Sequence, residues 1–169
     1  MRTKFSGGDV RRLDTFRLRR FLTVTEREQI AAALAEASRH TRARIGLSID
    51  ERASRDPRER ARRCFAEWKL PEDERLTAVL VYVSASSRTY AIVGGQEVQR
   101  LAPPTFWDLV HRDLSHHFEE GRYCDGIFKA IAQVALLLER LFPRGLEEAA
   151  GGHPNICKGA GGDPTRQPE

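Results

Sequence analysis

The stretch Thr77–Gly95, TAVLVYVSASSRTYAIVGG, decides the fold. Residues 77–83 form an unbroken run of β-branched and apolar side chains, which predicts a strand. Polar residues 84–88 predict a turn, and residues 89–93 predict a second strand that ends at a Gly-Gly pair. Because so short a link joins antiparallel neighbours, the stretch predicts a β-hairpin. Its first arm has no polar face, so we expect it at the centre of a sheet covered on both sides.

A third strand precedes the hairpin. Residues 45–49 alternate apolar and small side chains, and Asp56-Pro57 with Glu59 predicts a helix over 57–68. The acidic residues 72–74 are expected in a loop between this helix and the hairpin. A strand–helix–strand unit predicts parallel strands with a right-handed crossover. The fold class is therefore predicted as α/β, with a mixed central β-sheet flanked by helices in a single domain.

Three more helices are predicted around this unit. The spacing Thr25-x-x-Glu28 predicts a capping box opening the first, and Pro103-Pro104 precedes a second that Gly121 ends. The third begins near Asp125, is expected to be almost fully buried, and carries apolar residues at 4-3-4-3 spacing: Ile127, Ile131, Val134, Leu138 and Leu141. The same spacing would also allow a coiled-coil dimer, but two heptads with a further apolar flank favour packing in the core.

The charge is unevenly distributed along the chain. Residues 1–20 carry seven Lys/Arg and two Asp, a net +5, and because the whole chain is +4, the remainder sums to −1. This predicts a basic flexible arm over 1–20, an α/β domain over 21–143, and a Gly/Pro-rich disordered tail over 144–169. Arginines are also frequent over residues 52–63. They could form an anion-binding face, but the interleaved acids favour a solvated helix face.

Several functional classes receive no support from the sequence. No apolar run approaches the roughly 18 residues of a membrane span, and the basic N-terminal residues lack the apolar core of a signal peptide. We therefore expect a soluble cytoplasmic protein, with peripheral membrane contact as an option. The chain has no Walker loop, G-x-S-x-G or H-E-x-x-H motif. The basic arm lacks aromatic residues at stacking spacing, so nucleic-acid binding is not favoured.

A set of local motifs occurs in a fixed order: Thr25-x-x-Glu28, Thr41–Ile45, Val79–Val83, Arg88, Ile92-Val93-Gly94, Phe106-Trp107, Gly121-x-Tyr123-x-Asp125-Gly126-Ile127 and Phe142-Pro143. Over residues 21–143 this ordered set resembles the TPM-domain family, whose relatives include a thylakoid-lumen acid phosphatase, a photosystem repair protein and an acetylcholine-receptor modulator. The resemblance implies a compact α/β domain, with Arg88, Phe106, Trp107 and Gly126 as structural positions. It also implies phosphatase-like or calcium-binding properties and, for many members, membrane association.

The chain departs from that family pattern at three positions. The resemblance implies an acid where Arg44 stands, Asn near Thr77, and Asp where Gly95 stands. The predicted topology places these three residues at one sheet edge. Ca²⁺ requires several oxygen ligands, and the remaining candidate metal ligands are the acids Glu97, Asp73 and Glu74. The favoured alternative is a structural ion pair of Arg44 with Glu97 or Glu74.

The leading hypothesis is a non-catalytic TPM-like accessory or interaction domain with a degenerate metal edge. We expect no cofactor, with Ca²⁺ as the one option left open, a protein partner that could be a membrane protein, and a monomer in solution. The alternative is a Ca²⁺- or Mg²⁺-assisted acid phosphatase that uses the sheet-edge carboxylates. A third hypothesis is contact of the basic arm with anionic membrane or nucleic acid.

Overall fold

The predicted hairpin is present in the computed structural model, which describes residues 2–6, 21–51 and 55–145. It consists of β3 (Val79–Ser84) and β4 (Thr89–Gly94), paired antiparallel. Strand β2 (Ile45–Asp50) lies parallel to β3, as the crossover predicted. The sheet order is β1-β2-β3-β4, which leaves β4 as one edge strand.

The outer edge of β2 is covered by a strand that the sequence did not predict. Residues 2–6, assigned above to the flexible arm, form β1 (Arg2–Ser6), which pairs antiparallel with β2. This pairing satisfies backbone groups that β2 would otherwise expose at an edge. Residues 7–20 and 146–169 lie outside the described residues, so the predicted contact of the arm with anionic partners remains a prediction.

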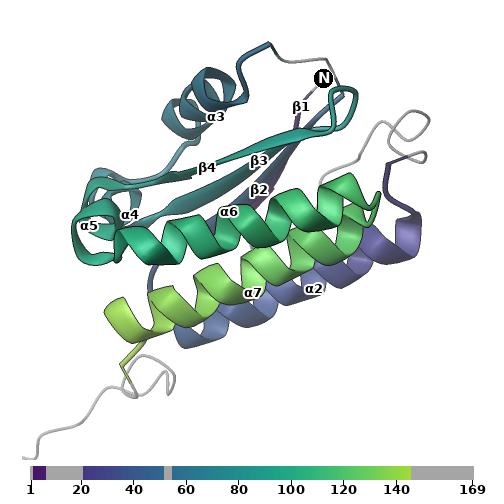
Figure 1. Cartoon of the computed structure of the whole chain (residues 1–169). Helices are drawn as coiled ribbons and strands as arrows, with labels where there is room; N and C mark the ends of the chain where they lie inside the picture. Colours follow the sequence, from purple (N-terminus) through teal and green to yellow (C-terminus); the bar gives the residue numbers. More distant parts are fainter. Residues whose placement is uncertain (1, 7–20, 52–54, 146–169) are drawn as a thin grey trace, which may run out of the picture.

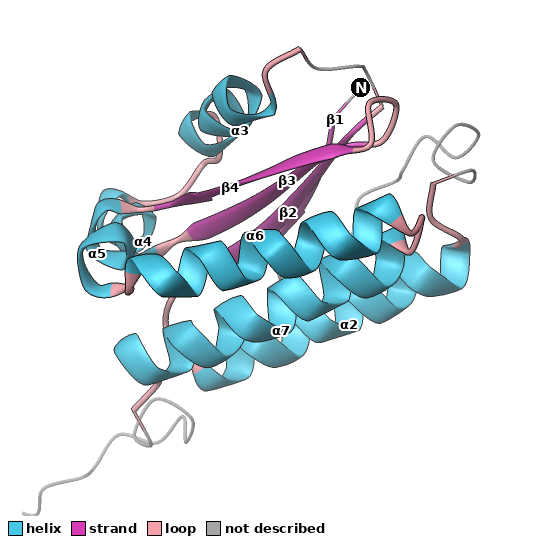
Figure 2. Ribbon diagram, in the orientation of Figure 1, coloured by secondary structure: helices cyan, strands magenta, loops and turns pink. Residues whose placement is uncertain are grey.

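Helices cover both faces of the sheet (Figure 1 and Figure 2). Helix α3 lies on one face, and three longer helices, α2, α6 and α7, lie on the other. Short helices α4 and α5 lie at the end where β3 begins and β4 ends. Their bounds are α2 Val24–His40, α3 Pro57–Ala66, α4 Glu72–Thr77, α5 Gln96–Leu101, α6 Pro104–Glu119 and α7 Tyr123–Leu141. The predicted fold class is confirmed.

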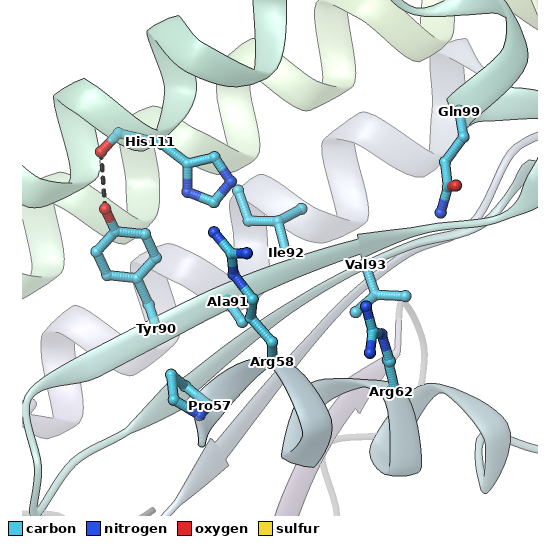
Figure 3. A pocket seen from close by; sticks show the side chains of 9 residues that line it. All are labelled: Pro57, Arg58, Arg62, Tyr90, Ala91, Ile92, Val93, Gln99 and His111. Carbon is cyan, nitrogen blue, oxygen red and sulfur yellow. Dashed lines mark hydrogen bonds between the residues drawn. The ribbon is translucent and has the colours of Figure 1, made fainter. Parts of the chain in front are cut away.

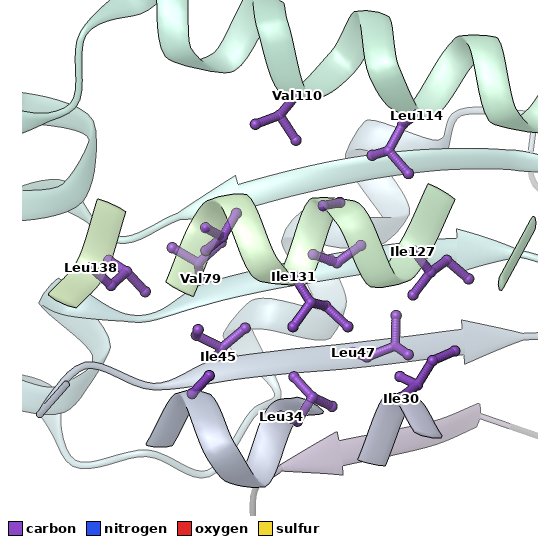
Figure 4. Close-up of a cluster of buried hydrophobic side chains, with 14 of the residues drawn as sticks. Ile30, Leu34, Ile45, Leu47, Val79, Val110, Leu114, Ile127, Ile131 and Leu138 are labelled. Carbon is purple, nitrogen blue, oxygen red and sulfur yellow. The ribbon is translucent and has the colours of Figure 1, made fainter. Parts of the chain in front are cut away.

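The residues of β3 alternate between two hydrophobic cores. The odd-numbered residues Val79, Val81 and Val83 belong to the larger core, which fills the space between the sheet and α2, α6 and α7 (Figure 4). Leu80 and Tyr82 belong to a smaller core beneath α3. All six β3 residues are buried, which confirms the prediction of a central strand covered on both faces.

Three local predictions are wrong. The capping box of α2 is Thr23 with Glu26, two residues before the predicted pair, because Thr-x-x-Glu occurs twice and the earlier start buries Leu22. The acids 72–74 were expected in a loop but form the first turn of α4, where negative side chains interact favourably with the helix dipole. The short helix α5 was not predicted. Helix α7 is not almost fully buried: Phe128 is 46% and Leu136 is 63% exposed, because both lie off its buried stripe.

Candidate functional site

The end of the sheet where β3 begins brings the three predicted edge residues together. The backbone N–H of Val79 donates to the carbonyl oxygen of Arg44 at 2.8 Å, and that of Gly95 donates to Ala78 at 2.8 Å. Thr77 immediately precedes Ala78 and closes α4. The predicted convergence of Arg44, Thr77 and Gly95 is confirmed, and we call this part of the structure the sheet corner.

The charged groups of the sheet corner form an ion pair. The Arg44 guanidinium donates twice to Glu74, from Nε to Oε2 at 2.7 Å and from Nη2 to Oε1 at 3.3 Å. The bond to Glu74 raises the pKa of Arg44. The two side chains are 39% and 29% exposed, so the pair is partly shielded from water. The predicted structural ion pair is therefore confirmed, with Glu74 rather than Glu97 as the partner.

Gly95 contributes to the corner through the absence of a side chain. A Cβ on Gly95 would lie 2.2 Å from the carbonyl oxygen of Arg75 and 2.4 Å from that of Leu76. Both oxygens belong to the backbone of α4, so they cannot move aside as a side chain could. The close approach of α4 thus leaves no room at position 95 for the carboxylate that the family resemblance implies there.

A second charged cluster, which the sequence did not predict, lies at the opposite end of β2. Asp50 is 1% exposed and accepts two bonds from Arg60 on α3, from Nε at 3.1 Å and Nη2 at 3.0 Å. The Tyr82 hydroxyl lies 3.4 Å from the same carboxylate oxygen. This pair of a buried carboxylate and a partly exposed guanidinium fastens α3 to the sheet. The one sequence feature that could have indicated this site is the position of Asp50, an acid directly after the predicted strand 45–49.

A groove of about 400 Å³ runs along β4 between α3 and α6 (Figure 3). Figure 3 shows Arg58 and Arg62 rising from α3 toward β4, with His111 facing them from α6. The remaining residues that line it are Pro57, Tyr90, Ala91, Ile92, Val93 and Gln99. None of these described lining residues is acidic, so the groove is cationic. We call it the β4 groove.

Helix α6 holds the Tyr90 side chain of the β4 groove. The Tyr90 hydroxyl donates to the backbone oxygen of His111 at 2.7 Å, and the two rings stack with centroids 5.8 Å apart. Burial lowers the pKa of His111, and the charge of Arg58 lowers it further. Burial also raises the pKa of Tyr90. Near neutral pH the cationic character of the groove therefore comes from the two arginines.

In the comparison with protein families, the model of the TPM domain matches residues 17–136. The chain belongs to the TPM-domain family. Its fold also resembles that of the BA42 protein from the psychrophilic bacterium Bizionia argentinensis, with a TM-score of 0.68 and 24% identity over 75% of this chain and 88% of that one. A second similar structure is the N-terminal domain of a P. gingivalis protein, with a TM-score of 0.59 and 14% identity over 72% and 79% of the two chains. The comparison with curated proteins gives no match.

Two of the predicted structural positions of this TPM domain, Arg88 and Gly126, lie where elements meet, and the other two, Phe106 and Trp107, contact each other. Arg88 lies in the β3–β4 turn with φ +54°, and its guanidinium lies 5.8 Å from the ring centroid of Tyr123, which begins α7. Phe106 and Trp107, at the start of α6, contact edge to face with centroids 5.1 Å apart. A Cβ on Gly126 would lie 2.9 Å from that of His117, so glycine allows α7 to approach α6 closely.

The predicted metal ligands do not converge in this TPM domain. Glu74 is paired with Arg44, and Glu97 accepts from Arg100 on its own helix at 2.7 Å, a bond that lowers the pKa of Glu97. Asp73 is exposed in the first turn of α4. Among the described residues, no three His, Cys, Asp or Glu side chains are grouped to hold a metal. A guanidinium beside the remaining acid would repel a cation, so the corner does not fit Ca²⁺.

The described helices also bear on the membrane prediction. None of those over residues 21–51 and 55–145 combines the length and apolarity needed to cross a bilayer.

In the β4 groove, the charge of Arg58 contributes to lowering the pKa of His111, and this effect can be tested. Folding lowers the pKa of His111. The corresponding contribution to stability is present at a pH above the pKa of histidine in the unfolded chain, about 6.5. It is lost as the pH falls toward the lower pKa that His111 has in the folded protein. Arg58→Gln removes one cause of the lowering, so we expect the pKa of His111 to rise in an NMR titration of its imidazole. Arg63→Gln is the control, because Arg63 is on the same helix but pairs with Glu59. Equal His111 titrations in both variants would contradict the interaction.

Proposed function

We propose that this TPM domain is a non-catalytic interaction module in which a structural ion pair has replaced the metal-binding chemistry of the sheet corner. The observation that carries the proposal is the double hydrogen bond between Arg44 and Glu74. These bonds pair the Glu74 carboxylate with the Arg44 guanidinium, at the position where a metal would need unpaired oxygen ligands.

Two further observations support this proposal. The backbone of α4 occupies the space that a side chain at Gly95 would need. Glu97 forms an ion pair with Arg100 on the same helix, α5. A phosphatase that relies on a metal to polarise a phosphoryl oxygen needs several free carboxylates at one place, and two of the three candidate acids, Glu74 and Glu97, are each paired with an arginine. Its remaining surfaces are then available for binding a protein.

Calorimetric titration of the full chain with Ca²⁺ tests the proposal. We expect no saturable heat of binding at millimolar Ca²⁺, and the same result for Glu97→Gln and Asp73→Asn. Hydrolysis of p-nitrophenyl phosphate, assayed with Ca²⁺ or Mg²⁺, should stay at the level of a blank without protein. Arg44 should matter only for stability, because its role is to hold Glu74.

Two results would overturn the proposal. One is stoichiometric Ca²⁺ binding that is abolished by Glu97→Ala or Asp73→Ala. The other is turnover of the aryl phosphate that persists through purification and disappears in Glu97→Ala. Either would favour the metal-assisted phosphatase.

A further inference from the structure

The outer edge of β4 presents backbone groups that the sheet does not use. Gly95 donates to Ala78 across the hairpin, and hydrogen-bonded pairs alternate along an antiparallel ladder. The odd-numbered residues of β4 therefore bond to β3. The even-numbered residues Tyr90, Ile92 and Gly94 direct their N–H and C=O groups away from the sheet.

One of these outward groups already has a partner. The side-chain amide of Gln99 donates to the Gly94 carbonyl at 2.7 Å, which agrees with the outward direction. No hydrogen bond from another described residue reaches the outward backbone groups of Tyr90 or Ile92. In Figure 1 no described helix or strand lies alongside β4 on its outer side. Unpaired edges of this kind are the template on which an added strand pairs.

The two sides of this edge differ in chemistry. On the α3 side, Arg58 and Arg62 line the β4 groove, and neither forms an ion pair with a described residue. On the α6 side lies a second hollow of about 350 Å³, whose lining is mainly apolar and includes Trp107 and Pro104. Ile92, with Gln99 and His111, lines both hollows, so they form one continuous site along the edge.

We propose that this edge binds an extended acidic segment of a partner protein, which adds to the sheet as a fifth strand beside β4. Successive side chains of a strand face opposite sides of a sheet, so acidic residues at alternate positions would face Arg58 and Arg62, and apolar residues between them would face Trp107. The inference rests on the proposed function, since it names the partner class of the interaction module.

The spacing of the two arginines matches such a segment. They are four residues apart on α3, which places them roughly 5–6 Å from each other along the helix. Side chains two apart on a strand are separated by roughly 6.6 Å. Two acids at i and i+2 can therefore each meet one guanidinium while the intervening backbone pairs with Tyr90 and Ile92.

Charge selects this occupant over a second copy of the chain. Pairing β4 with β4 of another molecule would bring two sets of Arg58 and Arg62 to the same edge, with no acid from the groove lining to neutralise them. Like charges placed together at an interface disfavour it. An acidic peptide supplies the missing countercharge.

Fluorescence anisotropy with the full chain tests the inference. The probe is a fluorescein-labelled peptide with the core Glu-Val-Glu-Val-Glu flanked by serines. We expect saturable binding that weakens as salt is added, and a loss of affinity of about tenfold or more in Arg58→Glu/Arg62→Glu. The matched control Arg140→Glu/Arg144→Glu carries the same change of net charge on two exposed arginines outside the groove. It should bind as the wild type does.

Two further measurements separate strand addition from simple charge attraction. Hydrogen exchange should show that the peptide protects the amides of Tyr90 and Ile92, whereas Ala91 and Val93 are protected with or without it. A peptide that is N-methylated on its β4-facing residues should not bind, although its charge is unchanged. These measurements use the wild-type chain, so they do not depend on whether a variant folds.

Several outcomes would overturn the inference: no binding of the acidic peptide, equal binding of a Lys-Val-Lys-Val-Lys peptide, binding without protection of Tyr90 and Ile92, or wild-type self-association through β4. None of them would affect the proposed function, which fails only through Ca²⁺ binding or phosphate turnover at the sheet corner. The two proposals can therefore fail separately.

Discussion

Gly95→Ala is expected to lower the free energy of unfolding by about 3 kcal/mol or more, among the largest effects of a single methyl group in this protein. The added Cβ would lie 2.2 Å and 2.4 Å from two carbonyl oxygens of α4. Contacts this short between the Cβ and backbone oxygens require α4 to move away from the sheet. Such a movement would also disturb Glu74, which α4 carries.

Urea unfolding followed by tryptophan fluorescence measures this effect, with Gly94→Ala as the matched control. A Cβ on Gly94 would lie 3.5 Å from Val98, an ordinary van der Waals contact. Its free energy of unfolding should stay within about 1 kcal/mol of the wild type, because the substitution also reduces the freedom of the unfolded chain. If both alanine variants unfold alike, the corner has room for a side chain at position 95. A carboxylate side chain could then be accommodated at that position.

The sequence predicted those features of the fold that depend on local pattern. The apolar run of β3, the short turn after it and the helix between β2 and β3 were sufficient to predict a mixed sheet and a central strand. That topology was also sufficient to place Arg44, Thr77 and Gly95 at one edge of the sheet, whereas the residue-by-residue register comes from the structure. The sequence could not decide between Glu74 and Glu97 as the partner of Arg44, because that depends on the unpredicted helices α4 and α5.

The two polar sites that the sequence missed depend on tertiary placement. Arg60 meets Asp50 only because the crossover sets α3 against the end of β2. Arg58 and Arg62 were interpreted as part of a solvated helix face, since acids are interleaved with them in sequence. In the folded chain none of those acids lines the β4 groove, whereas both arginines do. Helix periodicity indicates that Arg58 and Arg62 share a face of α3, but not that this face lies beside the edge strand β4.

Asp50→Ala is the second substitution with a large expected effect, a loss of about 3 kcal/mol in the free energy of unfolding. The carboxylate is buried and accepts both guanidinium bonds of Arg60 at 3.0 and 3.1 Å. Removing it leaves a partly buried cation without that countercharge and takes one partner from the Tyr82 hydroxyl. Glu59→Ala is the control, because it breaks an exposed ion pair with Arg63 on the same helix and should cost less than about 1 kcal/mol.

The double variant Asp50→Ala/Arg60→Met identifies the cause of this loss. If the unpaired guanidinium is responsible, removing it should make the double variant more stable than Asp50→Ala alone in urea unfolding. A double variant no more stable than the single one would assign the loss to packing instead. A cost for Asp50→Ala equal to that of Glu59→Ala would contradict the role of Asp50 in fastening α3. Because α3 carries Arg58 and Arg62, Asp50→Ala should also weaken binding of the acidic peptide, although Asp50 does not line the groove.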